Sequence, residues 1–564
     1  MKVFAPLQWI TWIAYLACTP GFAQTPSAGS IQQNIDNTVH QLPGPSKEVS
    51  KLIPAPDVHP IGGISFKLSK IDYSGNTFLT NDQIDLVIAP FLHKSIDFTQ
   101  LQVLATYIED AYRRLGFLAR VVIPEQTIRN DLLIIRIEES NWGKVRIEGL
   151  SKRVDSQQIS KTIISSQKTG QPLNIKTLER GLLLADDLPG VTVSGVLSQS
   201  NTALTTDLIA HIKDDPLYTV SIQTDNSGPK SIGTNRLVGN LGINSPLGIG
   251  DLFTGVFLWS EGSNYSRLGY TLPIGHDGLR VGVNTSVMSY KLVSSEFEGL
   301  RASGSSTSNG LEALYSLIRS RLTNLYTVLN TDYRVFSNSN ASSGLMSQYS
   351  VMDYSASLFL SILDEVGWVS SNSLSLVFIN GYTNLDGSPN QNAVATSNNA
   401  QGSFTKIRYS ANRTQFLDRN GLSLYASLSG QATGANLDPS EMFYLGGMNG
   451  VRAYPSNEGA GSQGQLISFE LRHLMTENVN LVLFYDYGHV LVNPNNAYAV
   501  AGDLSGYSQK GTGLSVGVKP YSNTDLKAIW AKRLGTDPNL SSSGTYQNGS
   551  SGSTQIWFIA SIGF

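Results

Sequence analysis

Apolar and polar residues alternate along most of the chain from Tyr218 to Phe564. Between 479 and 488, Asp486 lies on one face, and the opposite face carries Val479, Leu481, Leu483, Tyr485 and Tyr487. The end of the chain repeats the pattern with one face made of Ile556, Phe558, Ala560, Ile562 and Phe564. A period of two predicts β-strands. An apolar face opposite a polar one is typical of a wall with lipid outside and water inside.

The strand-like segments number about sixteen, or roughly 22 residues for a strand with its loop, whereas a membrane strand needs only about 9–11 residues. The residues that are not needed to cross the membrane suffice for turns and for long polar loops. We expect these loops at 384–402, 433–463, 492–510 and 535–552. We therefore predict that residues 215–564 form a transmembrane antiparallel β-barrel of about sixteen strands. The alternative is a soluble β-solenoid or double sandwich. It is disfavoured because its apolar face would point inward and its charges outward.

Helical and strand periods alternate in residues 64–213, and one unit occurs twice. The first unit has a strand, two helices and two strands, at 64–73, 82–92, 101–115, 120–123 and 132–137. The second repeats this order at 144–149, 154–166, 175–187, 191–197 and 205–212. About 75 residues are enough for a small domain. We therefore predict two α+β domains, at 64–140 and 141–214.

The N-terminus has the pattern of a secretory signal peptide over residues 1–23. Lys2 is followed by an apolar run from Leu7 to Cys18 and by the small-residue site Gly21-Phe22-Ala23. Cleavage would remove Cys18, the only cysteine, and with it any disulfide or thiol chemistry. The alternative is a lipoprotein acylated at Cys18, which is disfavoured because the aliphatic Leu16 lies one place too late for that motif.

Residues 24–62 are polar and interrupted by prolines. Four apolar residues recur there at spacings of four, four and three, namely Ile31, Ile35, Val39 and Leu42. This predicts a polar helix with one narrow apolar stripe, and the alternative is a disordered tail. The prolines after Leu42 would end the helix and leave a tether, and twenty residues at about 3.1 Å each span roughly 60 Å. We therefore predict a plug helix and a proline-rich linker.

Composition and motifs give no support for an enzyme or a nucleic-acid-binding protein. Charged residues make up 15% of the chain, and the formal net charge is −3. Gly513–Gly517 fits a serine-hydrolase elbow around Ser515, and 459–464 fits a dinucleotide-binding pattern, but neither is followed by the helix that such sites require. The seven histidines lack metal-ligand spacing. We predict no catalysis, no cofactor and no metal.

Four motifs resemble those of a known family. Two of them are Gly116-Phe117 followed by Val-Val-Ile-Pro-Glu-Gln at 121–126, and Asn-Ser-Pro-Leu-Gly-Ile-Gly-Asp at 244–251. The most specific is Leu-Gly-Gly-Met-Asn-Gly-Val-Arg-Ala-Tyr at 445–454, together with Phe-Tyr-Asp-Tyr-Gly at 484–488. Over nearly its whole length the chain resembles the TpsB transporters of two-partner secretion. These are relatives of the filamentous haemagglutinin exporter and the haemolysin secretion/activation proteins, within the BamA-like superfamily.

The resemblance implies that the two repeated units are POTRA domains and that residues 445–454 are the tip of a long loop folded into the barrel. Arg452 would pair there with Asp486, in a lumen that Glu470 also faces, beside the motif residues Val451, Tyr454, Phe484 and Gly488. The family usually has glycine where this chain has Ala453. A positive φ at that position would cost alanine roughly 1–2 kcal/mol. The terminal Phe564 resembles the signal by which the barrel assembly machinery recognises its precursors.

The resemblance further implies an outer-membrane transporter with its POTRA domains in the periplasm. These domains would capture an unfolded secreted exoprotein of the TpsA type, partly through a sheet edge formed by Arg120, Val121, Val122 and Ile123. The exoprotein would thread the barrel after the plug has left. Other expected partners are outer-membrane lipid and, during biogenesis, the barrel assembly machinery and periplasmic chaperones; nucleic acid is not expected. The alternatives are a BamA-like insertase, which usually carries three or more POTRA domains, and a passive porin or adhesin, which lacks them.

Overall fold

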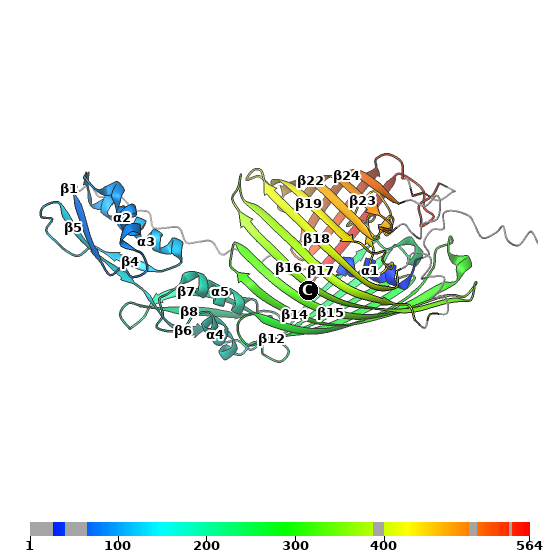
Figure 1. Ribbon diagram of the computed structural model, residues 1–564, viewed down its shortest axis with the longest axis horizontal. Coiled ribbons are helices and arrows are strands. Elements are labelled where there is room, and N and C mark those ends of the chain that lie inside the picture. Colours follow the sequence, from blue (N-terminus) through cyan, green and yellow to red (C-terminus); the bar gives the residue numbers. More distant parts are fainter. Residues whose placement is uncertain are drawn as a thin grey trace, which may run out of the picture.

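The computed structural model describes residues 26–39, 65–386, 388, 400–495, 505–537, 539–540 and 544–564. Figure 1 shows a β-barrel with two small α+β units at one end and helix α1 inside the barrel. The predicted signal peptide and the predicted linker after Val39 lie outside the described residues.

Sixteen antiparallel strands form a closed barrel, which confirms the predicted fold class. They follow one another around the ring in chain order, and β26 pairs with β9 to close it. Their bounds are β9 (Tyr218–Asp225), β10 (Arg236–Asn244), β11 (Leu252–Ser260), β12 (Ser263–Ile274), β13 (Leu279–Lys291), β14 (Ala302–Arg319), β15 (Thr323–Asn340), β16 (Leu345–Asp364), β17 (Ser370–Asn384), β18 (Gly402–Phe416), β19 (Leu422–Thr433), β22 (Gln463–Thr476), β23 (Val479–Leu491), β24 (Gly506–Tyr521), β25 (Thr524–Arg533) and β26 (Thr554–Gly563).

The two faces of the barrel strands differ in polarity as the alternation predicts. On the outer face of β22 and β23, Phe469 is 55% exposed and Leu483 is 53% exposed, whereas Asp486 on the inner face is 0% exposed. Large apolar side chains directed outward around a closed ring suit contact with lipid. Among the described residues, no helix is both long enough and apolar enough to cross a membrane.

The two repeated units have the predicted order of elements. The first contains β2 (Lys70–Ser74), α2 (Asn81–Ile88), α3 (Phe98–Leu115), β4 (Ala119–Val122) and β5 (Leu132–Glu139), and the second contains β6 (Asn141–Glu148), α4 (Ser156–Ser165), α5 (Ile175–Asp186), β7 (Val191–Gln199) and β8 (Thr205–Asp214). Each sheet has its last strand in the centre, in the orders β2-β5-β4 and β6-β8-β7. One detail differs from the prediction. The predicted first strand at 64–73 forms two strands, β1 (Phe66–Leu68) and β2, and β1 pairs with a short additional strand, β3 (Lys94–Ile96), whereas β2 pairs with β5.

Local capping fixes the ends of the helices in the first unit. Thr80 caps α2, and Asp97 caps α3, each with a glutamine three residues later that completes a capping box. Helix α3 ends at Gly116, whose φ of 94° favours glycine. This glycine is the first residue of the Gly116-Phe117 motif, so that motif marks a helix end.

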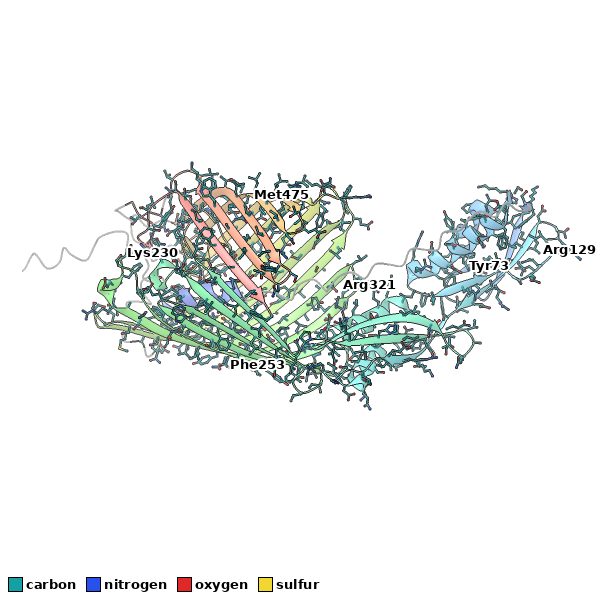
Figure 2. All side chains as sticks on the ribbon, turned by 180° about the vertical axis from the view of Figure 1, so that it is seen from behind. Tyr73, Arg129, Lys230, Phe253, Arg321 and Met475 are labelled. Atoms are coloured by element: carbon teal, nitrogen blue, oxygen red, sulfur yellow. The ribbon has the colours of Figure 1, made fainter. Side chains whose placement is uncertain are left out.

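The second unit is held against the barrel by charged side chains. Arg319 at the end of β14 donates two hydrogen bonds to Asp187, of 2.7 and 2.8 Å. Arg321, labelled at this junction in Figure 2, forms an ion pair of 2.9 Å with Glu179 on α5. Arg180 of the same helix donates to the backbone oxygen of Ser316 at 2.8 Å. The second unit is therefore fixed at the rim of the barrel through β14 and the turn after it.

Glu139 at the end of β5 organises the loop before α2. Burial alone would raise the pKa of its carboxyl group, but hydrogen bonds from Thr77, Phe78 and Tyr112 outweigh burial and lower this pKa. A lowered pKa in the folded state means that the carboxylate stabilises the unit above its unfolded pKa of about 4.3 and that this contribution is lost as the pH falls through the lower folded value.

Replacement of this carboxylate tests its contribution to stability. We expect Glu139→Gln to destabilise the first unit by about 1 kcal/mol at pH 7, because charge-assisted hydrogen bonds are replaced by weaker ones. Hydrogen exchange of the β5 amides in the detergent-solubilised full chain measures this loss. The difference from the wild type should shrink below about pH 4; an equal difference at every pH would contradict the role of the charge.

Candidate functional site

Helix α1 (Ala28–Val39) lies inside the barrel against its wall. Ile31 and Ile35 are 0% and 1% exposed and belong to one apolar cluster with residues of the barrel wall. Polar contacts hold the same helix: Ser306 donates to Gln32 at 2.7 Å, and Tyr265 donates to Asp36 at 3.2 Å. Of the four predicted stripe residues, Val39 ends the helix without a described side chain, and Leu42 lies outside the described residues.

A long hairpin loop between β19 and β22 shares the lumen with α1. This hairpin loop (434–462) contains the short strands β20 (Phe443–Tyr444) and β21 (Ala460–Gly461), which pair with each other. Gln33 of α1 donates to the backbone oxygen of Met442 at 2.6 Å, and Asn34 donates to Asn457 at 2.8 Å. Residues of α1, the hairpin loop and the wall together line a cavity of about 290 Å³. The helix therefore rests on the loop as well as on the barrel.

The tip of the hairpin loop is bound to the wall through Arg452. Its Nε donates to Oδ2 of Asp486 at 2.8 Å, and its Nη2 donates to Oδ1 at 2.7 Å, which is a bidentate pair. Its Nη1 donates to Glu470 at 2.7 Å. Arg452 is 7% exposed and Asp486 is 0% exposed. The pair is thus buried, and removal of Arg452 would leave the carboxylate of Asp486 without the cation that contacts it.

The residues around this pair shape the site. The guanidinium of Arg452 lies 3.5 Å from the centre of the Phe484 ring, an arrangement that favours a cation. Val451 and Tyr454 are buried. Gly488 leaves room for the loop, because a Cβ there would lie 2.6 Å from Leu445 and 3.0 Å from Val451. The structure thus brings together the predicted pair of Arg452 and Asp486 with Glu470 and the four motif residues, and we call this group the lock.

Two contacts of Arg452 are absent from the prediction. Ser468 on β22 accepts from Arg452 at 2.9 Å and donates to Asp486 at 2.6 Å. Trp557 on β26 donates from its ring nitrogen to the backbone oxygen of Arg452 at 2.8 Å. The sequence offers one signal for Ser468, which lies on the same strand face as Glu470, and none for Trp557.

Ala453 requires no left-handed backbone. It is not among the residues with positive φ, so the strain considered for alanine does not arise. Its Cβ points toward Gly511 on β24, where an added Cβ would approach it to 2.6 Å. A glycine on the wall therefore accommodates the methyl group on the loop.

Comparison with known proteins identifies the family. The model of the haemolysin secretion/activation protein family ShlB/FhaC/HecB matches residues 205–518, and that of the ShlB-type POTRA domain matches residues 66–140. The chain belongs to the ShlB/FhaC/HecB family. It is therefore a TpsB-type transporter of the outer membrane, and transporters of this family translocate secreted partner proteins.

Individual relatives agree with this assignment. The heme/hemopexin transporter protein HuxB of Haemophilus influenzae is 23% identical over 494 residues, which cover 86% of each chain. The solved structure of CdiB from Escherichia coli has a TM-score of 0.68 at 19% identity and covers 92% of this chain and 94% of its own. BamA from Haemophilus ducreyi lacking POTRA domains 1–3 has a TM-score of 0.54 at 15% identity, covering 88% of this chain and all of its own. At these identities the structural likenesses show a shared fold.

The predicted partner-binding strand of this TpsB transporter is an edge strand. Arg120, Val121 and Val122 belong to β4, at the edge of the first sheet, and Ile123 follows it. However, Glu109 on α3 accepts a hydrogen bond of 2.9 Å from the backbone N–H of Val121. The second unit repeats this feature, because Asp186 accepts from the N–H of Val193 on the edge strand β7 at 2.7 Å. Each edge thus has one backbone donor that a helix carboxylate already holds.

The C-terminus of the transporter lies at the seam of the barrel, where the last strand, β26, pairs with the first, β9. Phe564 is 72% exposed, and its N–H donates to Val220 of β9 at 2.8 Å. Five residue pairs join β26 to β9, from Ile559↔Asp225 to Gly563↔Ser221, whereas nine join β25 to β26. The predicted assembly signal is therefore exposed next to a short strand pairing.

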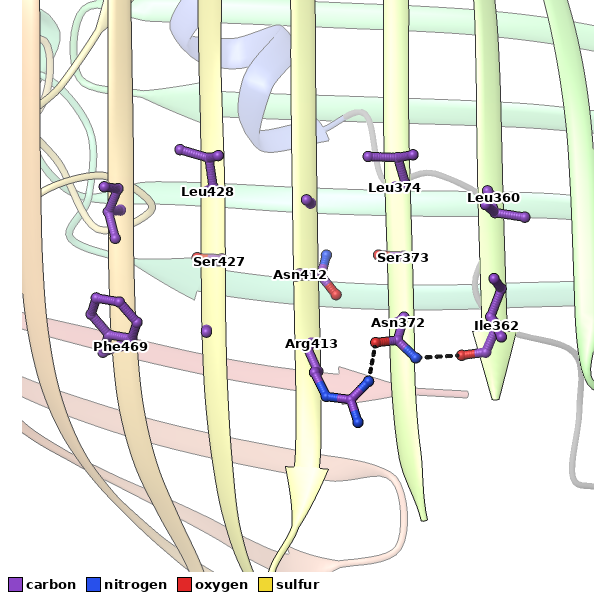
Figure 3. A pocket seen from close by; sticks show the side chains of 13 residues that line it. Leu360, Ile362, Asn372, Ser373, Leu374, Asn412, Arg413, Ser427, Leu428 and Phe469 are labelled. Atoms are coloured by element: carbon purple, nitrogen blue, oxygen red, sulfur yellow. Dashed lines mark hydrogen bonds between the residues drawn. The ribbon is translucent and has the colours of Figure 1, made fainter. Parts of the chain in front are cut away.

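A groove of about 570 Å³ lies on the outside of the barrel, away from the lumen. Figure 3 shows Leu374, Leu428 and Phe469 along it, with α1 behind the strands. At one end Arg413 donates to Asn372 at 2.7 Å and forms an ion pair of 3.1 Å with Asp364. The groove is apolar and its polar end is satisfied from within the protein, so it belongs to the lipid-facing wall. In the described part of the chain, no three His, Cys, Asp or Glu residues are grouped to hold a metal ion.

Proposed function

We propose that this transporter captures an unfolded exoprotein of the TpsA type with its two POTRA domains and passes it through the lumen after α1 has left. The domain boundaries proposed with it are a signal peptide at 1–23, a plug helix and linker at 24–62, POTRA domains at 64–140 and 141–214, and a barrel at 215–564. The position of α1 carries the proposal, because a helix from the start of the chain fills part of a closed lumen. A channel with such an occupant has a closed state and, once the helix leaves, an open one.

One observation and one prediction from the sequence support the reversible exit of α1. Its contacts combine two buried isoleucines with hydrogen bonds that water can replace, namely those of Gln32, Gln33 and Asn34. The predicted tether of about 60 Å is longer than the apolar band of a barrel, about 25 Å. The helix can therefore leave the lumen while it remains part of the chain.

We propose that the exoprotein adds a strand to the free edge of β4, where backbone hydrogen bonds bind an extended segment with little dependence on its side chains. Glu109 competes for this edge through its bond to Val121. This capture mode suits an unfolded client.

Removal of the competing carboxylate tests capture at this edge. We expect Glu109→Ala to strengthen binding of the unfolded N-terminal region of the exoprotein by about fivefold, since one backbone donor worth about 1 kcal/mol becomes available. The measurement is the dissociation constant of the detergent-solubilised full chain. Asp110→Ala is the matched control, because Asp110 pairs with Arg113 on the helix surface. Equal affinities for both variants would count against β4 as the binding edge.

The remaining partners follow from the exposed surfaces. The apolar outer wall, including the groove in Figure 3, would contact outer-membrane lipid. Phe564 at the seam would be recognised by the barrel assembly machinery, after periplasmic chaperones have delivered the chain. A BamA-like insertase remains the alternative because of the shared fold. Binding of one specific secreted protein, rather than of many barrel precursors, separates the two functions.

A further inference from the structure

The hairpin loop has two legs, the residues before its tip and the residues after it. Glu441 lies in the first leg, eleven residues before Arg452, and is 2% exposed. Lys406 on β18 donates from Nζ to its Oε2 at 2.5 Å and to its backbone oxygen at 2.9 Å. Arg334 on β15 donates to its Oε1 at 2.5 Å. The side chain of Lys406 is 0% exposed. Glu441 is therefore a buried carboxylate held by two cations of the barrel wall.

These contacts lie on a different part of the wall from those of Arg452. Glu441 reaches β15 and β18, whereas Arg452 reaches Glu470 on β22 and Asp486 on β23. Gln431 on β19 strengthens the same end of the loop, because its side-chain amide donates to the backbone oxygens of Glu441 at 2.8 Å and of Ser462 at 2.9 Å. Both legs of the hairpin loop are thus tied to the wall near Glu441.

The charges around Glu441 oppose withdrawal of the loop. Arg334 also bonds Asp353 on β16, so the wall alone supplies one carboxylate in contact with this cation. If the loop left, Lys406 would lose the carboxylate that it contacts, and Arg334 would lose one of two. A buried cation without its partner is strongly unfavourable. The hairpin loop therefore supplies, through Glu441, the negative charge that the two cations of the wall require.

We infer that Glu441 is a second anchor of the hairpin loop, independent of Arg452. We further infer that it holds in place the part of the loop on which α1 rests, which we call the seat of α1. The neighbouring residue Met442 provides the backbone oxygen that accepts from Gln33 of α1. Release of the anchor moves this acceptor and loosens the helix, although Arg452 still binds the tip. The part of this inference that concerns α1 rests on the proposed plug function, whereas the anchor itself does not.

Hydrogen exchange of the purified full-length protein tests the anchor directly. In Glu441→Gln the backbone amides of residues 437–446 should exchange about tenfold faster than in the wild type, because the charged contacts that hold this leg are lost. The matched control is Glu312→Gln on β14, a wall carboxylate that lies next to Gly282, away from the hairpin loop. Equal exchange in the two variants would overturn the inference.

A double-variant cycle separates anchoring from a general packing effect. Lys406→Met alone should accelerate exchange of residues 437–446, and Lys406→Met combined with Glu441→Gln should exchange within about twofold of Glu441→Gln alone, because both substitutions remove the same contact. Fully additive effects in a barrel that still migrates as folded on unboiled gels would also overturn the inference.

The same variants in planar lipid bilayers address the seat of α1. We expect Glu441→Gln and Lys406→Met each to raise the conductance, because each removes a charged contact that holds the hairpin loop. If deletion of residues 26–39 left the conductance of the wild type unchanged, the plug would be rejected, while the exchange results would still decide on the anchor. If that deletion raised the conductance but Glu441→Gln did not, the seat assigned to Glu441 would be rejected.

Discussion

Replacement of Arg452 by alanine is expected to reduce secretion of the exoprotein about a hundredfold while the barrel remains assembled. The reason is electrostatic: Asp486 is 0% exposed, and the substitution removes the cation that it shares with Glu470. Loss of one partner of a buried pair costs about 3–5 kcal/mol. That cost is large enough to detach the tip of the hairpin loop from β22 and β23. The amount of exoprotein in the culture medium measures export, and the mobility of the unboiled protein on gels measures assembly.

Two further variants make this experiment specific. Arg452→Lys keeps the charge but cannot form the bidentate pair, so its secretion should lie between those of wild type and Arg452→Ala. Arg472→Ala is the control, because Arg472 bonds the same Glu470 at 2.7 Å and stacks on Tyr425 without contact to Asp486. Undiminished export by Arg452→Ala would show that the pair is not required for transport.

Deletion of residues 26–39 is expected to raise the single-channel conductance of the purified protein severalfold. The deletion removes Ile31 and Ile35 from the apolar cluster and opens the space that α1 occupies beside the hairpin loop. Water and ions enter such a space readily because polar and charged residues line it, as in other water-filled barrels. Conductance in planar bilayers is the measurement.

A second deletion serves as the control for the plug. Removal of residues 45–54 shortens the predicted linker but keeps α1, so the conductance should stay at the wild-type value. An intermediate variant, Ile31→Asn with Ile35→Asn, should increase the frequency of openings, because two buried apolar side chains that each contribute about 1.5–3 kcal/mol are replaced by polar ones. A conductance that no variant changes would exclude α1 as the barrier.

The architecture follows from the sequence because it depends on local periodicity. Residues such as Leu483 and Asp486 alternate with a period of two, and this alone separates a lipid-facing side from a water-facing side. In the same way the spacing of Leu101, Leu104 and Ile108 predicts α3, which buries all three. The short strand β3 escaped prediction, because three residues are too few to establish a period.

The lock illustrates the limit of motif reasoning. The resemblance identifies Arg452 and Asp486, and the polar face of the segment that forms β23 independently places Asp486 toward the lumen. Glu109 was not found, because its role depends on the approach of α3 to the edge of β4. Trp557 was not found either, since its bond to Arg452 spans 105 positions and exists only because the barrel closes.

Local periodicity in the chain identifies the barrel strands, the main helices and the lipid-facing side of the wall, and a family motif identifies the lock. Only the tertiary structure decided which inward-facing charges meet. Alternation places Glu441's partners Arg334 and Lys406 on the inner wall, but the register of neighbouring strands and the path of the hairpin loop bring them within 2.5 Å of its carboxylate. Periodicity assigns a side chain to a face, whereas contacts across a lumen depend on the closure of the ring, to which every strand contributes.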